Sequence, residues 1–204
     1  MSGRVVPLGR VLAASLAALA LVTTLPSAAN AAGDCPEQPS SQVFAPWGDP
    51  AQYVFAPDGG FEQGAAGWRL SGGAAVQDGN EAYDVVDPGD AHSLALPADS
   101  SATTPPVCIS VAHPTIRLFV RNTGSPASTL RVSVVWRGLL GLPIELPIGS
   151  VAGTEAWEPS LPVPIVVNLL SLIGDQDVTF RFRAADDGGE WSIDDLHIDP
   201  YSKG

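Results

Sequence analysis

Three segments of the chain place an apolar residue at every second position: 116–120, 130–136 and 178–184. In each of them the even-numbered residues are apolar, and most of the residues between them are polar. Since successive side chains of a β-strand point to opposite faces of the sheet, this period gives each strand one apolar face. Such strands are typical of antiparallel sheets that cover a core on one side. The pattern therefore predicts that alternate side chains fill the space between two sheets.

Shorter apolar runs between turn-forming residues continue the pattern along the chain. The further predicted strands are residues 42–44, 53–56, 68–70, 82–86, 93–96, 107–111, 144–151 and 191–198. Turn-forming residues are frequent, with 21 Gly and 19 Pro in the chain. About ten short strands without a convincing helical period predict an all-β fold, a two-sheet antiparallel β-sandwich of jelly-roll type. Residues 165–173 fit either a strand or a short helical turn.

The N-terminal segment has the features of a secretory signal peptide. Arg4 and Arg10 form a basic start, a mostly apolar run follows over 11–25, and Ala29-Asn30-Ala31 matches a small-residue cleavage pattern. The apolar run is too short for a stable membrane span. We therefore predict that residues 1–31 are a signal peptide and that the mature protein is secreted.

Two cysteines, Cys35 and Cys108, stand in the part of the chain that follows this segment. In an oxidising compartment an isolated pair usually forms a disulfide, and a loop of this length contributes about 4 kcal/mol in the chain-entropy model. We expect the bridge to hold a loosely ordered lead-in, 32–41, against a jelly-roll domain that comprises 42–202. A lipoprotein is the less favoured alternative, because Asp34 rather than a small residue precedes the first cysteine.

Acidic residues outnumber basic residues by 22 to 10, which gives a net charge of −12. Loss of Arg4 and Arg10 with the signal peptide changes −12 to −14. A field of this sign repels nucleic acid and anionic membrane surfaces, and it attracts divalent cations. The charge therefore argues against nucleic-acid and membrane partners.

Patterns typical of enzymes are weak in this sequence. The histidines His92, His113 and His197 lie far apart and lack the spacing of metal ligands. The sequence contains neither a G-x-S-x-G elbow nor a phosphate-binding P-loop. Acidic pairs such as Asp186-Asp187 stand in Gly-rich turns and are expected to be solvated. We therefore expect a binding protein rather than an enzyme.

Three motifs carry a family resemblance: Gly59-Gly60-Phe61-Glu62 with a following Gly67-Trp68, then His92-Ser93-Leu94-Ala95-Leu96, then Trp191-Ser192-Ile193-Asp194-Asp195-Leu196. Their order resembles the galactose-binding-like jelly rolls, which include several families of secreted carbohydrate-binding modules. A longer pattern that ends at Asp199-Pro200-Tyr201 is also similar to an uncharacterised family of secreted actinobacterial proteins. The resemblance implies a jelly roll whose first and last strands are neighbours.

In those carbohydrate-binding modules a structural calcium often lies where the first and last strands meet. The resemblance implies side-chain ligands from Glu62 and from Asp194 or Asp195, with backbone oxygens near Gly60 and His92-Ser93. Calcium prefers six to eight oxygen ligands of this mixed kind. Because alternation points the two aspartates to opposite faces, we expect one principal ligand and prefer Asp195. The alternative is that these acids only accept hydrogen bonds from turn amides.

Arginines form a second pattern. Six of them occupy odd positions in, or directly after, the three alternating segments: Arg117, Arg121, Arg131, Arg137, Arg181 and Arg183. If these strands share one sheet, the arginines project from one face, with Phe119 and Val135 among them. Arginine side chains match planar anions, so this face is a candidate site for a carboxylate- or sulfate-bearing ligand. The alternative is that neighbouring acids neutralise them.

Aromatic side chains are a further test of sugar binding, because exposed rings stack on sugar C–H groups. Trp136, Trp68 and Trp191 fall in strands and are expected in the core. The Pro- and Gly-rich contexts of Trp47 and Trp157 make them the candidates for exposed rings. For Tyr53 and Tyr83 the sequence favours neither an exposed nor a buried ring.

The sequence thus predicts a secreted, non-catalytic binding module, for a carbohydrate or another cell-surface polymer, with a structural calcium. The alternative is an extracellular structural or interaction protein without a sugar ligand.

Overall fold

Strands dominate the described part of the chain, which comprises residues 1, 3, 35–110, 113–138, 140–165 and 176–199 of a computed structural model. The chain divides into two units, Met1–Ala31 and Ala32–Gly204, and the fold below is that of the second. Most of the predicted signal peptide, the undecided segment from residue 166 onward and residues 200–202 lie outside the described residues. The removal of the signal peptide stays a prediction.

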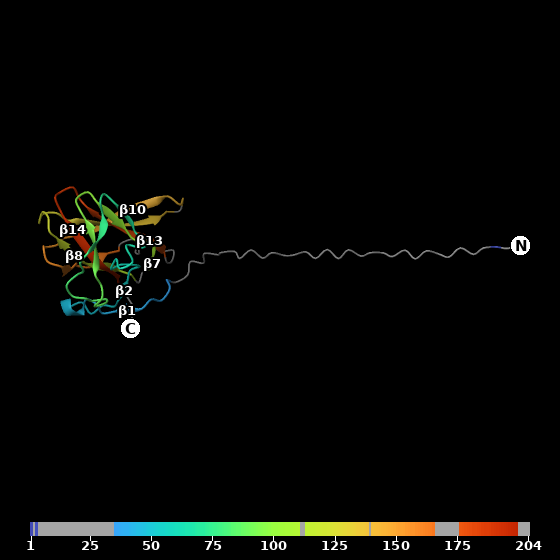
Figure 1. Cartoon of the computed structure of the whole chain (residues 1–204), viewed down its shortest axis with the longest axis horizontal. Coiled ribbons are helices and arrows are strands. Elements are labelled where there is room, and N and C mark those ends of the chain that lie inside the picture. Colours follow the sequence, from blue (N-terminus) through green and yellow to red (C-terminus); the bar gives the residue numbers. More distant parts are fainter. Residues whose placement is uncertain (2, 4–34, 111–112, 139, 166–175, 200–204) are drawn as a thin grey trace. The chain divides into compact units, whose positions relative to one another are not determined.

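The first sheet has eight strands arranged around the last strand of the chain (Figure 1). They are β1 (Ser40–Ser41), β2 (Tyr53–Phe55), β4 (Ala75–Asp78), β5 (His92–Leu96), β8 (Thr115–Asn122), β11 (Glu158–Pro159), β12 (Val163–Pro164) and β14 (Trp191–Ile198). Strand β14 pairs with β8 along one edge. Along its other edge β14 pairs first with β5 and then with β2. The last strand is therefore a neighbour of the second strand, β2, whereas the short first strand, β1, pairs with β2 on its other side.

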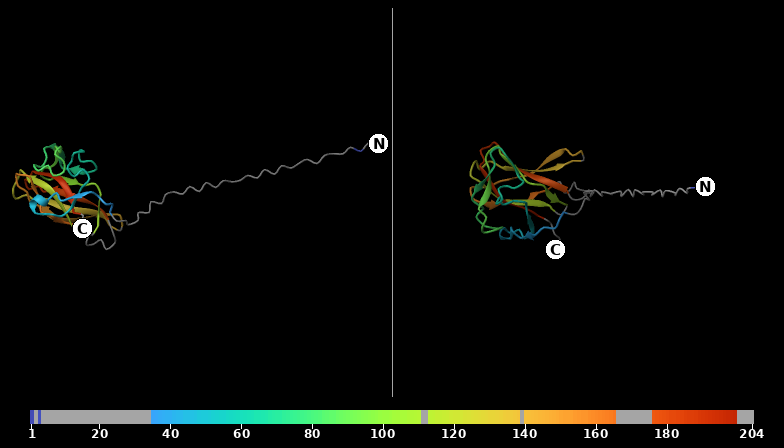
Figure 2. Two further views of the ribbon diagram at one scale, coloured as in Figure 1. Left: turned by 90° about the horizontal axis from the view of Figure 1, so that it is seen from below. Right: turned by 45° about the vertical axis from the view of Figure 1, so that its right-hand side comes forward.

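The second sheet has six strands in the order β10-β9-β13-β6-β3, and β7 also pairs with β13. They are β3 (Arg69–Ser71), β6 (Ser101–Thr103), β7 (Val107–Ile109), β9 (Leu130–Arg137), β10 (Pro143–Val151) and β13 (Gln176–Ala184). The pairings in both sheets are antiparallel. The β9–β10 hairpin, yellow to orange in Figure 2, reaches out from the rest of the sandwich.

The main core lies between the two sheets and consists of the even-numbered residues of the alternating strands. Val132, Val134, Phe180 and Phe182 are fully buried, and Leu118 is buried in the opposite sheet. Each large apolar side chain contributes about 1.5–3 kcal/mol when it leaves water. Period-two burial and the all-β two-sheet fold are thereby confirmed.

Trp136 is the weakest member of this series. It is half-buried and packs against the edge of the core, near the end of β9.

Some predicted strands are absent from the described structure. Residues 42–44 form a turn that leads into a short 3₁₀ helix, η1 (Ala45–Trp47), which ends at Gly48 in a left-handed conformation. Residues 82–86 form a loop, because the Glu81 carboxylate accepts hydrogen bonds from the backbone amides of Tyr83 and Val85. Conversely β4 and β6 were missed, since their short sequences carry only a weak apolar pattern. Among the described residues no helix is long and apolar enough to cross a membrane.

Residues 42–51 cover the outer face of the eight-stranded sheet. Phe44 is fully buried there, and its ring stacks on that of Phe119 at 5.5 Å between centroids. The Arg117 guanidinium lies 4.1 Å from the centre of the Phe44 ring and donates to Asp49 Oδ2 at 2.6 Å. Tyr53 Oη donates to the same carboxylate oxygen at 2.8 Å. This second apolar cluster therefore closes around a buried ion pair.

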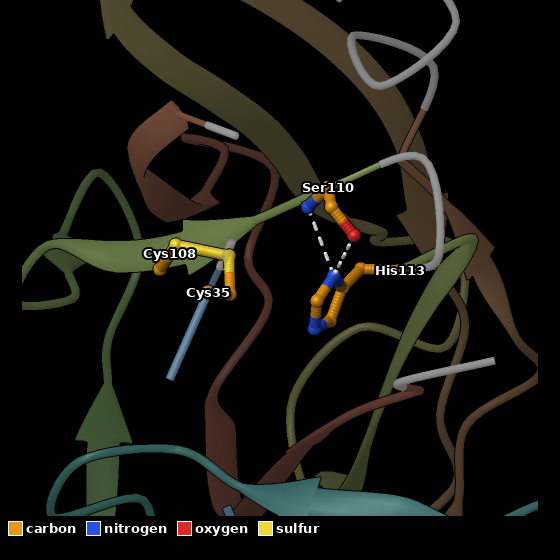
Figure 3. The surroundings of a disulfide bond; sticks show 4 residues. All are labelled: Cys35, Cys108, Ser110 and His113. Atoms are coloured by element: carbon orange, nitrogen blue, oxygen red, sulfur yellow. Dashed lines mark hydrogen bonds between the residues drawn. A yellow bond between two sulfur atoms is a disulfide. The ribbon is translucent and has the colours of Figure 1, made fainter. Parts of the chain in front are cut away.

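The predicted disulfide joins Cys35 to Cys108, with Cα atoms 5.5 Å apart (Figure 3). Cys108 lies in β7 of the six-stranded sheet, whereas β1 pairs with β2 in the eight-stranded sheet. The segment between Cys35 and β1 therefore links the two sheets. The expected lead-in is ordered at its end, where Ser40 and Ser41 form β1.

Replacement of Cys108 by Ser should lower the free energy of unfolding by about 3–4 kcal/mol, because the unfolded chain regains the entropy of a 73-residue loop. Urea unfolding, followed by tryptophan fluorescence, measures this change. Addition of a thiol reductant should destabilise the wild type and leave the Ser variant unchanged. Equal stability of the two proteins under oxidising conditions would contradict the expectation.

Replacement of Asp49 by Asn should cost about 2–4 kcal/mol, because it leaves the buried Arg117 guanidinium without its counter-charge. Burial raises the pKa of Asp49, but hydrogen bonds from Tyr53, Ala51 and Arg117 outweigh burial and hold this pKa below its ordinary value. The contribution is therefore present above pH 4 and is lost as pH falls through the lowered pKa. The stability difference between wild type and variant should stay constant from pH 6 to about pH 4 and narrow as pH falls further, and Asp186→Asn in an exposed turn serves as the control.

Candidate functional site

A break in the pairing of β14 creates the first candidate site. The register of β14 with β8 shifts between Asp194 and His197, and Asp195 has a φ of 45°. Pairing with β5 ends at Ile193, and pairing with β2 begins only at His197. The Gly59-Gly60 turn occupies the interval, where Leu196 N–H donates to the Gly59 carbonyl at 3.2 Å.

Gly60 lies directly against the two aspartates. A Cβ atom at this position would stand 2.9 Å from Asp195 Oδ1 and 3.9 Å from Asp194 Oδ1. A Cβ atom at the neighbouring Gly59 would stand 2.9 Å from the backbone carbonyl oxygen of Leu196, so the close approach of the turn to β14 favours glycine. The expectation that Asp194 and Asp195 point to opposite faces is therefore wrong: the left-handed backbone at Asp195 breaks the alternation and brings both carboxylates to the same turn.

The two aspartates differ in their hydrogen bonds. Asp194 Oδ2 accepts from the Glu81 amide at 3.1 Å and Oδ1 from the Asp195 amide at 2.9 Å. Within the described residues neither carboxylate oxygen of Asp195 has a hydrogen-bond partner, although both are buried. The side-chain amide of Asn80 is buried and unpartnered in the same sense. Unpaired buried polar atoms are costly, so these oxygens point to a ligand that the protein chain does not supply.

Both aspartates have pKa values above the ordinary value of an aspartate. Burial, followed by the charge of Asp195, raises the pKa of Asp194 to about 9. Burial, followed by the charges of Glu81, Asp90 and Glu62, raises the pKa of Asp195 to about 8. Ionisation of these acids costs stability as pH rises from about 4 toward these values, because the folded chain holds their protons more tightly. A cation bound beside these carboxylates would offset this cost.

Glu62 lies near Asp195 but is engaged elsewhere. Its carboxylate accepts from the backbone amides of Ala91 and His92 and contacts His92 Nδ1 at 2.8 Å. This hydrogen bond with Glu62 raises the pKa of His92. Ser93 is buried, and its hydroxyl accepts from Gln77 at 3.3 Å. Glu62 thus pins the start of β5 to the Gly60 turn, and its role as a ligand stays a prediction, as does that of the Ser93 carbonyl.

No group of three or more His, Cys, Asp or Glu side chains in the described residues converges on one point that could hold a metal ion. A ligand set built here would therefore use the Asp195 carboxylate and backbone oxygens, and Asn80 directly precedes Glu81, whose amide donates to Asp194. Such an all-oxygen set, with few carboxylates, suits calcium rather than zinc. Asn80 was not a predicted ligand, because in the sequence it appears only as part of the turn signal Asp78-Gly79-Asn80.

The arginines do not form one face. Arg117 and Arg121 lie on β8 in the eight-stranded sheet, whereas the other four lie on β9 and β13 in the six-stranded sheet. Arg117 is buried with Asp49, and Arg121 lies over the Trp157 ring, 5.0 Å from its centre. Period two shows which residues share one side of a strand, but it does not show which sheet the strand joins. The prediction of one six-arginine face is therefore wrong.

The outer face of the six-stranded sheet is the second candidate site. Cross-strand register places Arg183 between Arg131 and Ser101, and Arg181 between Ser133 and Thr103. One strand further, Arg69 lies opposite Thr103. Arg181 pairs with Glu145, and Arg183 pairs with Asp99 at 3.1 Å. Hydroxyl and guanidinium groups, with Val135 half-buried among them, make this face polar.

Arg137 lies at the far end of this face and donates to the Gly141 carbonyl at 2.9 Å within the β9–β10 hairpin. Its guanidinium therefore supports the hairpin.

The tryptophans supply no exposed pair of rings. Trp68 and Trp191 are buried, as predicted. Trp47 and Trp157, the candidates for exposed rings, are half-buried against the second apolar cluster, where the Trp47 ring contacts that of Tyr83. Tyr53 is buried, and Tyr83 is 44% exposed. The outer side of β2 and β8 in the eight-stranded sheet is thus covered by the chain itself.

A serine and a histidine meet beside the disulfide (Figure 3). His113 Nδ1 accepts from the backbone amide of Ser110 at 2.9 Å and lies 3.1 Å from its hydroxyl. Since this nitrogen already accepts a hydrogen bond from the backbone amide of the residue three positions earlier, the contact is a turn hydrogen bond rather than an activated nucleophile.

The buried histidine of β14 is not a charged group. Burial lowers the pKa of His197 to about 4, which keeps that ring neutral.

No family model and no curated protein matches the chain. Solved structures show the same fold. The CBM22-1 xylan-binding domain of Paenibacillus barcinonensis aligns with a TM-score of 0.50 and 19% identity, over 71% of this chain and 93% of that one. CBM22-1 and GH10 modules of a Clostridium thermocellum endo-1,4-β-D-xylanase, complexed with xylohexaose, align with a TM-score of 0.52 and 12% identity over 74% of this chain, which spans 29% of theirs. The protein is thus a jelly-roll β-sandwich that resembles carbohydrate-binding modules in structure, whereas the likeness to an actinobacterial family stays a prediction.

Proposed function

We propose that the protein is a secreted, non-catalytic carbohydrate-binding module whose ligand lies on the outer face of the six-stranded sheet. One observation carries the proposal: residues 42–51 and the aromatic cluster cover the outside of one sheet, whereas the outside of the other presents exposed polar side chains. A wide polar face with several hydroxyl groups supplies the donors and acceptors that a sugar chain needs. The fold shared with a xylan-binding domain supports this assignment.

Secretion is part of the same proposal. A disulfide joins Cys35 to Cys108, and such bonds persist in oxidising compartments. The cleavage pattern at Ala31 lies at the boundary between the two units of the chain.

The structural calcium is the second part of the proposal. Asp195 and Asn80 would hold the ion, with backbone oxygens of the Gly60 turn. Bound there, the ion would supply positive charge between β14 and the turns that fill its interrupted edge. It would therefore stabilise the fold without taking part in a reaction.

A different function, protein interaction without a sugar ligand, is favoured by one feature. At the tip of the β9–β10 hairpin Leu140 is 87% exposed and Leu142 is 64% exposed. Exposed apolar side chains in a group often mark interaction surfaces. The binding experiment below decides between the two functions.

Binding is tested with a panel of neutral and acidic polysaccharides in affinity gels. The wild type should be retarded by at least one of them. The outer face of the six-stranded sheet is called the open face below. Both native cysteines are in the disulfide, so Ser133→Cys places one reactive thiol at the centre of this open face. A bulky maleimide on this thiol should abolish retardation, because it blocks the face whatever the sugar.

Glu155→Cys, labelled in the same way, is the matched control, because Glu155 is exposed in a loop outside the six-stranded sheet. It should bind as the wild type does. If no polysaccharide in the panel retards the wild type, the proposed function is rejected. If both labelled variants lose retardation equally, the proposed face is rejected.

Calcium is tested by melting curves. At a concentration about 100 times its Kd, a ligand adds about 2.7 kcal/mol, which corresponds to roughly 5–10 °C for a domain of this size. The wild type should gain this shift with calcium relative to EDTA. Asp195→Asn should lose it yet melt no lower than the wild type in EDTA, because the change removes a repelled carboxylate. Asp186→Asn should keep the shift; a wild type without any shift would contradict the site.

A further inference from the structure

Two arginines face each other across neighbouring strands on the open face. Arg131 on β9 is the direct cross-strand partner of Arg183 on β13. Like charges in this position destabilise a sheet. Both side chains are exposed, and among the described residues none forms an ion pair or side-chain hydrogen bond with the Arg131 guanidinium. The pair therefore lowers the stability of the protein alone, and a bound ligand of opposite charge would account for its presence.

The surrounding side chains leave this charge uncompensated. Of the four arginines in this half of the face, Arg69, Arg131, Arg181 and Arg183, two form ion pairs with the described residues, to Glu145 and Asp99, so 4 − 2 leaves two without an ion pair. The Arg183–Asp99 pair is open to water, with side chains 58% and 67% exposed. Exposed pairs of this kind contribute little and exchange readily for a better partner.

The excess is unusual for this chain, which carries 22 acidic residues against 10 basic ones. Although acids are abundant in the chain, none among the described residues pairs with Arg131. The cross-strand neighbours of the arginines on this face include the hydroxyl residues Ser101, Ser133 and Ser150. Guanidinium forks bind carboxylate and sulfate groups through paired hydrogen bonds, and hydroxyl groups bind the sugar ring beside them. The chemistry of the face thus matches a sugar that carries anionic groups.

We propose that the open face binds an anionic polysaccharide that runs across the strands, with its charged groups on Arg131 and Arg183 and on Arg181 and Arg69. From β9 to β3 there are three strand intervals, about 14 Å in total, which is the length of a few sugar units. The inference rests on the proposed function and names the ligand class of the same face.

The test compares polygalacturonate with its neutral methyl ester, and dextran sulfate with neutral dextran, by calorimetry. Wild type should bind at least one charged polymer about tenfold or more tightly than its neutral counterpart, and added salt should weaken that binding. The two charged polymers distinguish a carboxylate ligand from a sulfate ligand.

The decisive variant is Arg131→Glu. It should abolish binding of the charged polymer, yet raise the melting temperature, because it replaces a like-charge pair with an opposite-charge pair opposite Arg183. A merely structural arginine would do the reverse. Arg131→Ala should weaken binding about tenfold or more and melt no lower than the wild type. Arg121→Ala, which removes the same charge from the other sheet, is the matched control and should bind normally.

The outcomes distinguish a wrong ligand class from a wrong function. Equal binding of charged and neutral polymers, lost on labelling at Ser133→Cys, would overturn this inference and leave the proposed function standing. Unchanged binding in Arg131→Glu would overturn the inference as well. Failure to bind any polysaccharide would overturn both.

Discussion

The interruption of β14 is the constraint on which the rest of the structure depends. All eight residues of this strand are buried, so each polar group that it carries needs a partner inside the protein. Where β5 ends and β2 has not begun, the Gly59-Gly60 turn supplies backbone partners for Leu196. The same bulge turns two carboxylates toward that turn. Strand β14, which pairs with β2, β5 and β8, thus also carries the two buried carboxylates whose ionisation costs stability.

This arrangement explains why several loops are held by acidic side chains. Asp194 binds the Glu81 amide, the Glu81 carboxylate binds the amides of the following loop, and Glu62 binds the amides at the start of β5. Each carboxylate fixes one turn by accepting backbone protons. Asp195 is the exception, since it has no such partner among the described residues. The physical distinction between structural acids and a candidate ligand is therefore the hydrogen bond, not the charge.

Local patterns predicted the parts of the fold that depend on one strand at a time. The burial of Val132, Val134, Phe180 and Phe182 follows from period two, because the two faces of a strand differ wherever one covers a core. The sheet that each strand joins depends on pairings far apart in sequence, so β8 and β9 look alike in the sequence but lie in different sheets. This is why the arginines were assigned to one face.

The site was predictable to the same limited extent. The motif resemblance placed Gly60 and Asp195 together, and the structure brings them within contact. The bulge leaves no local signal, because it depends on the approach of the Gly60 turn to β14.

The two candidate sites complement each other through the core that separates them. Acidic side chains gather around β14 in one sheet, whereas the uncompensated arginines lie on the outer face of the other. Packed sheets are about 10 Å apart, and the space between these two holds Val132, Phe180 and Leu118, so neither group can reach the other to neutralise it. A cation would favour ionisation of the buried aspartates, and an anion would relieve the repulsion between the exposed arginines. A cation at the interrupted strand and a polyanion on the open face are the two partners that this division of charge favours.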